Sequence, residues 1–148
     1  MNGMTGVGRY GKALLLVALP LLLSATALAE APQKNYRLYC MGCHRLDGSG
    51  SPEVGIPSMK GEVGHFLRLA EGRAYLSQVP GTLNTPLSDK ETADLLNWMV
   101  VAIGKDSVPA NFVPYSGEDV ARYRAAIPAD IPALREKLMK RLAAGEGS

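Results

Sequence analysis

Both cysteines of this 148-residue chain lie in one five-residue stretch, Cys40-Met41-Gly42-Cys43-His44. Two thiols separated by two residues and followed at once by a histidine form the pattern of a c-type haem attachment site. Each thiol can add to one vinyl group of the porphyrin, and the imidazole of His44 can then bind the iron as the proximal ligand. The motif predicts one haem c per chain, held covalently through Cys40 and Cys43.

The alternatives explain fewer of these residues. A redox-active dithiol would not need the adjacent His44, and a structural zinc site would need cysteines that the chain lacks. A disulfide between Cys40 and Cys43 would close a very small loop and so add little stability. Two free cysteines in a core remain as a further alternative.

The first 29 residues have the pattern of a secretory signal peptide. Arg9 and Lys12 supply positive charge, residues 13–23 form an apolar core, and small residues at 27–29 suit a cleavage site before Glu30. The apolar core is much shorter than the roughly 20 residues that span a bilayer, so cleavage is favoured over an uncleaved anchor. We therefore expect a periplasmic protein with no membrane span after cleavage.

The charge balance limits the kind of partner. The whole chain carries 16 basic and 14 acidic side chains, but removal of Arg9 and Lys12 with the signal peptide leaves the two in balance. No basic stripe with interleaved aromatic residues follows, so we expect no nucleic-acid partner. Electrostatic steering towards a protein partner should be modest.

The residues after the signal peptide can form one small domain but not two independent cores. Helical patterns alternate with segments rich in glycine and proline, and no strand is convincing. Helices are predicted at 33–43, 65–79 and 88–103, and loops at 45–64 and 80–87. Gly72 can divide the second helix, and Ser88 with Glu91 forms a capping box at the start of the third.

A helical extension follows residue 104. Ser116 can cap one helix, and Asp130 can cap another that has Pro132 in its first turn. The last helix has an apolar and a charged face, which suits packing on the domain or docking on a partner. The predicted parts are a signal peptide at 1–29, a haem domain at 30–104 and the extension at 105–148.

Residues around the haem motif form a wider pattern. Tyr36 lies four residues before the first haem cysteine, and Trp98 lies in the helix that Ser88 caps. Between them stand Asp47-Gly48-Ser49-Gly50, Ile56-Pro57-Ser58-Met59-Lys60-Gly61 and Leu87-Ser88-Asp89. From Tyr36 to Ile103 the chain therefore resembles a class I cytochrome c domain.

The resemblance implies an all-α fold in which a few short helices surround one haem. It also implies that the first and last helices of the domain touch through Tyr36 and Trp98. The carbonyl of Pro57 would accept a hydrogen bond from the second ring nitrogen of His44, which would fix the orientation of the ring.

The segment at 78–87 departs from the family pattern. A methionine there usually supplies the distal iron ligand, but this chain has none in that segment. Asn84, His65 and Met59 are the candidates, although Met59 can equally fill a gap in the core. An iron without a distal protein ligand is also possible. Tyr75 could then donate a hydrogen bond to a bound molecule, or it could simply pack half-buried.

Two functions are compatible with these residues. The resemblance implies an electron carrier between a donor and an acceptor redox protein, which is not an enzyme and requires no second catalytic cluster; the sequence offers none. The alternative is a haem protein with an open or weakly ligated distal site that binds a diatomic gas or peroxide as sensor or catalyst. We favour electron transfer, and the missing methionine keeps the alternative in view.

Overall fold

The computed structural model describes residues 31–147, and the predicted signal peptide at 1–29 lies outside them. From Pro32 to the last described residue the chain forms one compact unit. Within the described range the chain is helical with no strand, apart from a bridge between Ser51 and Ile56. The predicted all-α fold is confirmed. None of the helices in this range has the length and apolar character needed to cross a bilayer.

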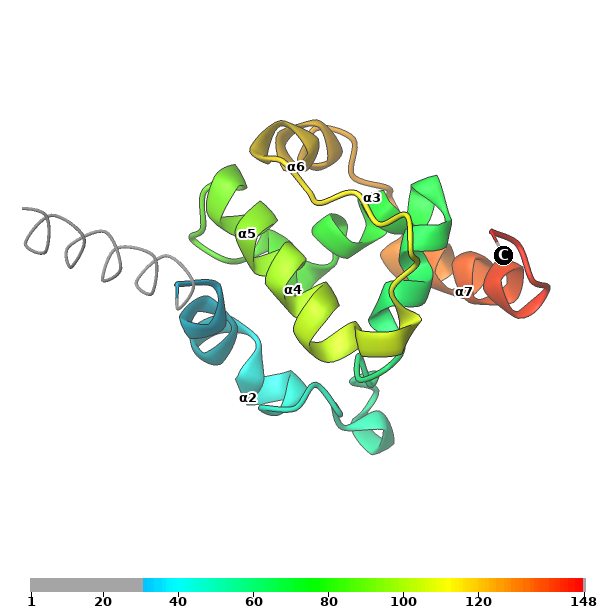
Figure 1. Cartoon of the computed structure of the whole chain (residues 1–148), viewed down its shortest axis with the longest axis horizontal. Helices are drawn as coiled ribbons and strands as arrows, with labels where there is room; N and C mark the ends of the chain where they lie inside the picture. The colour runs from blue at the N-terminus through cyan, green and yellow to red at the C-terminus, as the bar shows by residue number, and fades with distance from the viewer. Residues whose placement is uncertain (1–30, 148) are drawn as a thin grey trace, which may run out of the picture. The chain divides into compact units, whose positions relative to one another are not determined.

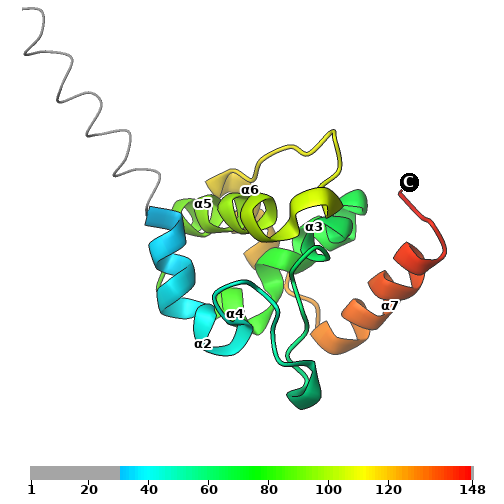
Figure 2. The same cartoon turned by 60° about the horizontal axis from the view of Figure 1, so that its bottom comes forward.

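The helices are short and follow one another closely (Figure 1). In chain order they comprise a helix through residue 39, α2 (Met41–His44), α3 (Ala70–Gln78), α4 (Pro80–Leu83), α5 (Asp89–Met99), α6 (Gly117–Arg124) and α7 (Ile131–Ala143). Shorter turns are the 3-10 segments η1 (Pro52–Val54), η2 (Val63–Arg68) and η4 (Lys105–Ser107), and the π-helical turn η3 (Val100–Gly104). In Figures 1 and 2, α2 and α7 lie at opposite ends of the unit.

The core joins the first helix to α5. Tyr36 is fully buried, and its ring lies 5.4 Å from that of Trp98, so the expected contact between the two helices is present. The Tyr36 hydroxyl donates a hydrogen bond to the carbonyl of Arg45, 2.8 Å away, just after the haem motif. Leu96 and Val100 continue the buried stripe of α5 into η3. Packing of Tyr36 thus fixes the entry into the haem motif.

The segment predicted as one helix at 65–79 is two elements. The break lies at Leu69, which is extended with φ −116° and ψ 133°, and not at Gly72. Gly72 lies inside α3, at a position where any side chain would collide with the carbonyl of Phe66. The glycine therefore permits a close approach between η2 and α3, and the prediction of a helix break at Gly72 is wrong.

The segment predicted as a loop at 80–87 contains the short helix α4. Pro80 occupies its first turn, where the fixed φ of proline suits a helix start. Asn84 ends it. The predicted capping box of α5 is confirmed, since Ser88 Oγ accepts from the backbone N–H of Glu91 and the Glu91 carboxylate accepts from that of Ser88.

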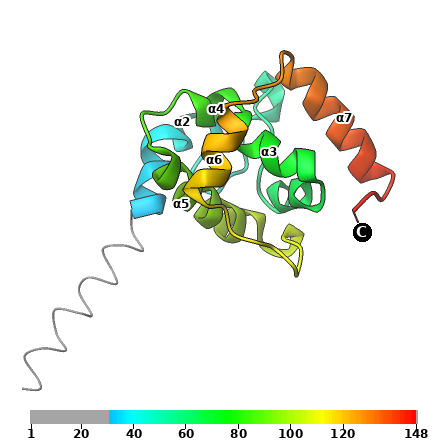
Figure 3. The same cartoon turned by 90° about the horizontal axis from the view of Figure 1, so that it is seen from above.

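The helices after residue 104 pack on the rest of the unit. Figure 3 shows α6 alongside α5 and α7 on the side of α3. Val120 of α6 and Leu138 of α7 are fully buried. Asp130 caps α7 through the N–H of Ala133, 2.8 Å away.

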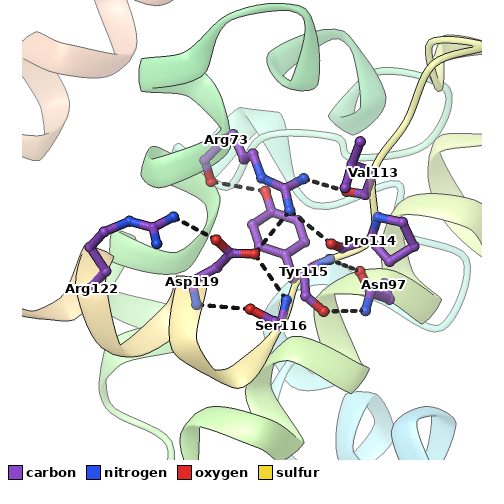
Figure 4. A network of polar contacts seen from close by, with 8 residues as sticks. All are labelled: Arg73, Asn97, Val113, Pro114, Tyr115, Ser116, Asp119 and Arg122. Carbon is purple, nitrogen blue, oxygen red and sulfur yellow. Dashed lines mark hydrogen bonds and ion pairs between the residues drawn. The ribbon is translucent and has the colours of Figure 1, made fainter.

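A polar network attaches α6 to the rest of the core (Figure 4). The Arg73 guanidinium donates to the carbonyls of Val113 and Pro114 and pairs with Asp119 at 3.4 Å. The same guanidinium lies over the ring of Tyr115, 4.0 Å from the centre of that ring. The Tyr115 hydroxyl donates a hydrogen bond to the Arg73 carbonyl. The network therefore joins the connection before α6 to the middle of α3.

Candidate functional site

The haem motif forms one helical turn. The N–H groups of Cys43 and His44 donate to the carbonyl of Cys40 at 3.2 and 2.9 Å. Residues three apart lie on the same face of a helix, so the two thiols share a face. Cys40 is half-buried at the edge of the core, Cys43 is exposed, and both are free thiols.

The environment of Cys40 differs from that of a reactive thiol. Burial, with a smaller contribution from Cys43, raises the pKa of the Cys40 thiol to about 11. Catalytic and redox-active cysteines have lowered pKa values, because the thiolate is the reactive form. The structure thus argues against the redox dithiol.

His44 is half-buried directly after the second cysteine. Burial lowers the pKa of its imidazole, and the nearby carbonyl of Pro57 opposes that effect. The Nδ1 atom is buried, and no acceptor in residues 31–147 meets hydrogen-bonding geometry with it. A neutral imidazole is the form that binds iron. The Pro57 carbonyl lies close enough to the ring to influence its pKa, and its hydrogen bond to Nδ1 stays a prediction.

Gly50 holds Pro57 beside His44. Its N–H donates to the His44 carbonyl at 3.0 Å, and its φ of +67° is in the left-handed region that favours glycine. A Cβ added there would lie 2.5 Å from the carbonyl oxygen of Pro57. Reciprocal backbone bonds between Ser51 and Ile56 close the loop between them. The glycine-rich sequence after the motif therefore brings Pro57 against the histidine turn.

The same loop is attached to η3, the turn that follows α5. The Gly48 carbonyl accepts the N–H of Met59 at 2.8 Å, and Gly48 itself packs directly on Ile103. Met59 is half-buried against the hydrophobic core. This placement fits the gap-filling role of Met59 and gives no separate support to a ligand role.

The other distal candidates come from different elements. Asn84 is exposed and donates its N–H to the Pro80 carbonyl at 3.0 Å. His65, in η2, is half-buried with a buried and unpartnered Nδ1. Tyr75 is buried and stacked on Phe66 at 5.2 Å. No hydrogen bond between described residues joins any of these three side chains to His44.

Tyr75 also shows that the extension reaches this side of the molecule. Burial raises the pKa of its phenol, and the Arg135 guanidinium of α7 opposes that rise. Three residues missed in the sequence analysis therefore connect the extension to the rest of the unit: Gln78 and Arg135 join it to α3, and Arg124 joins it to the segment after α4.

The residues present suit haem c. Two thiols share a face, a neutral imidazole follows them, and its second nitrogen is buried beside a carbonyl. In residues 31–147 no group of three or more His, Cys, Asp or Glu side chains is placed to hold a metal ion by itself. The donor set of His44 and two thiols is that of haem attachment.

Comparison with known proteins decides the family. No family model matches the chain. A cytochrome c-552 of Thermus thermophilus is 31% identical over 138 residues, which cover 80% of this chain and 93% of the relative. The chain belongs to the cytochrome c family. A second cytochrome c-552 of Thermus thermophilus is 30% identical over 119 residues, covering 67% of this chain and 90% of the relative.

This cytochrome therefore uses haem c, and its family acts in electron transfer. The all-α fold agrees with that membership. The alignment with the first relative is 138 positions long but covers only 80% of this 148-residue chain. The relative therefore contains residues that have no counterpart here.

Proposed function

We propose that this cytochrome is a periplasmic monohaem carrier that transfers single electrons between redox proteins. When bound, haem c takes up and releases one electron at its iron. Cys40 and Cys43 hold it by thioether bonds, and His44 is the proximal ligand. The single observation that carries the proposal is the helical turn that places both thiols on one face beside a half-buried imidazole.

Pro57 orients the histidine. Its carbonyl accepts the Nδ1–H of His44 in the loaded protein, which fixes the ring plane and increases the donor strength of the other nitrogen. The buried Nδ1 beside that carbonyl supports this role, and Gly50 allows the approach. Tyr36 and Trp98 support the turn by packing against each other beside it.

The partner surface lies around the haem motif. Five large apolar side chains are exposed along this segment: Leu38, Tyr39, Met41, Leu46 and Val54. An exposed apolar patch of this kind suits a brief contact with another protein. Electron-transfer encounters bury small areas, so a patch of this kind is sufficient. The signal-peptide pattern at 1–29 supports delivery to the periplasm.

A second function calls for a direct test because residues 78–87 contain no methionine. Asn84 is exposed at the end of α4 and is a weak ligand at most. An open distal position would let a diatomic gas or peroxide bind, and the protein would then act as sensor or catalyst.

One set of optical measurements tests both functions. We expect the exported protein to retain haem on a denaturing gel, to be reduced and reoxidised reversibly, and to lack the sulfur–iron charge-transfer band of a methionine ligand. A gel without haem would overturn the proposal. Rapid CO binding by the reduced protein would favour the second function, whereas no CO binding would indicate a strong protein ligand on the distal side.

A further inference from the structure

The end of α6 lies against the end of α3. Gln78, the last residue of α3, is only 3% exposed. Its side-chain amide donates to the carbonyls of Tyr123 and Ala126 at 2.8 and 3.0 Å. A buried amide that loses its acceptors costs free energy, so this pair of bonds holds Gln78 firmly under α6.

Arg124, also at the end of α6, contacts residues that follow α3 in the chain, between Thr82 and Thr92. Its guanidinium donates to the carbonyls of Leu87 at 3.4 Å and Thr82 at 3.5 Å. It also bonds Thr92 Oγ1 at 3.0 Å and pairs with Asp89 at 2.6 Å. The Arg124 side chain is 21% exposed, so solvent screens these contacts only in part.

Residues 79–88 have few other polar attachments. Their own bonds are local: Thr82 Oγ1 donates to the Leu76 carbonyl at 3.2 Å, and Thr85 Oγ1 donates to that of Thr82 at 3.0 Å. Within the described chain, the hydrogen bonds that reach this segment from more than six positions away come from Arg124. The extension therefore supplies its long-range polar support.

We propose that α6 sets the position of residues 79–88, with Gln78 and Arg124 as positioning residues, here called the distal clamp. The inference rests on the proposed function, because residues 79–87 fall in the segment that usually carries the distal ligand in the family. Gln78 fixes the beginning of the segment and Arg124 its middle and end. The distal clamp thereby controls how readily a ligand reaches or leaves the iron on this side.

The distal clamp differs from the other attachment of the extension. The Arg73 network binds the chain before α6 to α3 and contacts no residue of 79–88. Arg122 lies on α6 as well, but it is 63% exposed and pairs with Asp119 within the same helix. Arg122→Gln is therefore a matched control that changes an α6 arginine without touching the segment.

The test uses the haem-loaded protein and four variants: Arg124→Gln, Gln78→Met, Arg124→Lys and the control Arg122→Gln. Hydrogen exchange of residues 79–88 is measured by mass spectrometry, together with the reduction potential and the CO association rate. We expect Arg124→Gln and Gln78→Met to speed exchange in this segment about tenfold, without a similar change in α5. The same two variants should shift the potential or change the CO rate severalfold.

Arg124→Lys should recover part of both effects, because lysine keeps the charge but lacks the fork of donors. Unchanged exchange in Arg124→Gln and Gln78→Met would overturn the distal clamp. Faster exchange with a potential and CO rate equal to those of Arg122→Gln would also overturn it, since the segment would then have no influence on the iron. In that case covalent haem and reversible reduction in all variants would leave the proposed function intact. Loss of covalent haem from the unaltered protein would instead overturn the proposed function.

Discussion

The haem-motif segment, residues 36–60, and the extension, residues 105–147, are held in place by different forces. The motif segment is fixed by backbone hydrogen bonds and by glycines that allow close contact, such as Gly50 against Pro57. Its two cysteines form no disulfide, and the buried His44 Nδ1 has no hydrogen-bond partner among the described residues. The extension is fixed by side chains that bond backbone carbonyls far away in the sequence.

The network around Arg73 illustrates the second kind of region. In Figure 4 nearly every polar group points at a partner, and Asn97 both donates to and accepts from the backbone of Tyr115, at 3.0 and 2.7 Å. Such a region satisfies its own polar groups, whereas the motif segment leaves donors available for a cofactor. The comparison therefore separates residues that serve chemistry from residues that serve attachment.

The largest expected effect removes the chemistry of the motif segment. Cys40→Ala with Cys43→Ala should abolish covalent haem completely, because no other thiol exists in the chain. Met41→Ala, which changes the same turn but keeps both thiols and His44, is the control. Haem staining after denaturing electrophoresis measures the result. Haem that stays on the double variant would contradict the assignment of the site.

The next effect breaks the attachment of the extension. Arg73→Ala leaves the Val113 and Pro114 carbonyls without this donor and removes one of the partners of Asp119, so we expect a loss of about 2–3 kcal/mol in the free energy of unfolding. Urea denaturation of the loaded protein measures it. Lys140→Ala removes an exposed pair with Glu136 and should change stability by less than about 0.5 kcal/mol. Equal losses in the two variants would show that the network adds little.

The sequence predicted the motif segment better than the extension. Covalent attachment requires a fixed spacing of residues, so Cys40, Cys43 and His44 stand in an order that can be recognised without coordinates. Capping residues such as Ser88 and Asp130 are equally local and marked α5 and α7 correctly. These signals depend on neighbours within four positions.

The parts that could not be predicted depend on distant residues. Arg124 looks like a solvated charge in the sequence, and only the fold brings it to Thr82, 42 positions earlier. Gly72 suggests a helix break in the sequence, but a contact with the Phe66 carbonyl explains it. The positions of the distal candidates, Met59, His65 and Asn84, could not be predicted for the same reason. They depend on how residues 59–84 fold in three dimensions.

A smaller effect tests the glycine contact beside His44. Gly50 and Gly55 both have positive φ, +67° and +83°, but only at Gly50 would a Cβ meet another group, the Pro57 carbonyl. Gly55→Ala should cost about 1 kcal/mol for the backbone alone, and Gly50→Ala about 2–3 kcal/mol. Thermal denaturation compares them, and the reduction potential should shift only in Gly50→Ala. Identical behaviour would show that Gly50 does not support Pro57.

The smallest effect concerns the charge in the extension network. The backbone N–H of Ser116, the Arg122 guanidinium and the Ser116 hydroxyl hold the pKa of Asp119 at about 2, below its ordinary value of 3.8. An unfolded chain therefore takes up a proton there before the folded chain does, so acid weakens the network. The contribution of Asp119 should be complete above about pH 4 and disappear as the pH falls towards 2.

Asp119→Asn isolates this contribution, because all other titrating groups are common to both proteins. We expect the variant to be less stable by about 1 kcal/mol at pH 6 and the difference to shrink steadily below pH 4. Urea midpoints of both proteins across this range give the measurement. Added salt should reduce the part that depends on Arg122 and Arg73, and leave the part from the Ser116 N–H. A difference that persists unchanged to pH 2 would mean that the charge of Asp119 adds nothing beyond what its protonated side chain already contributes.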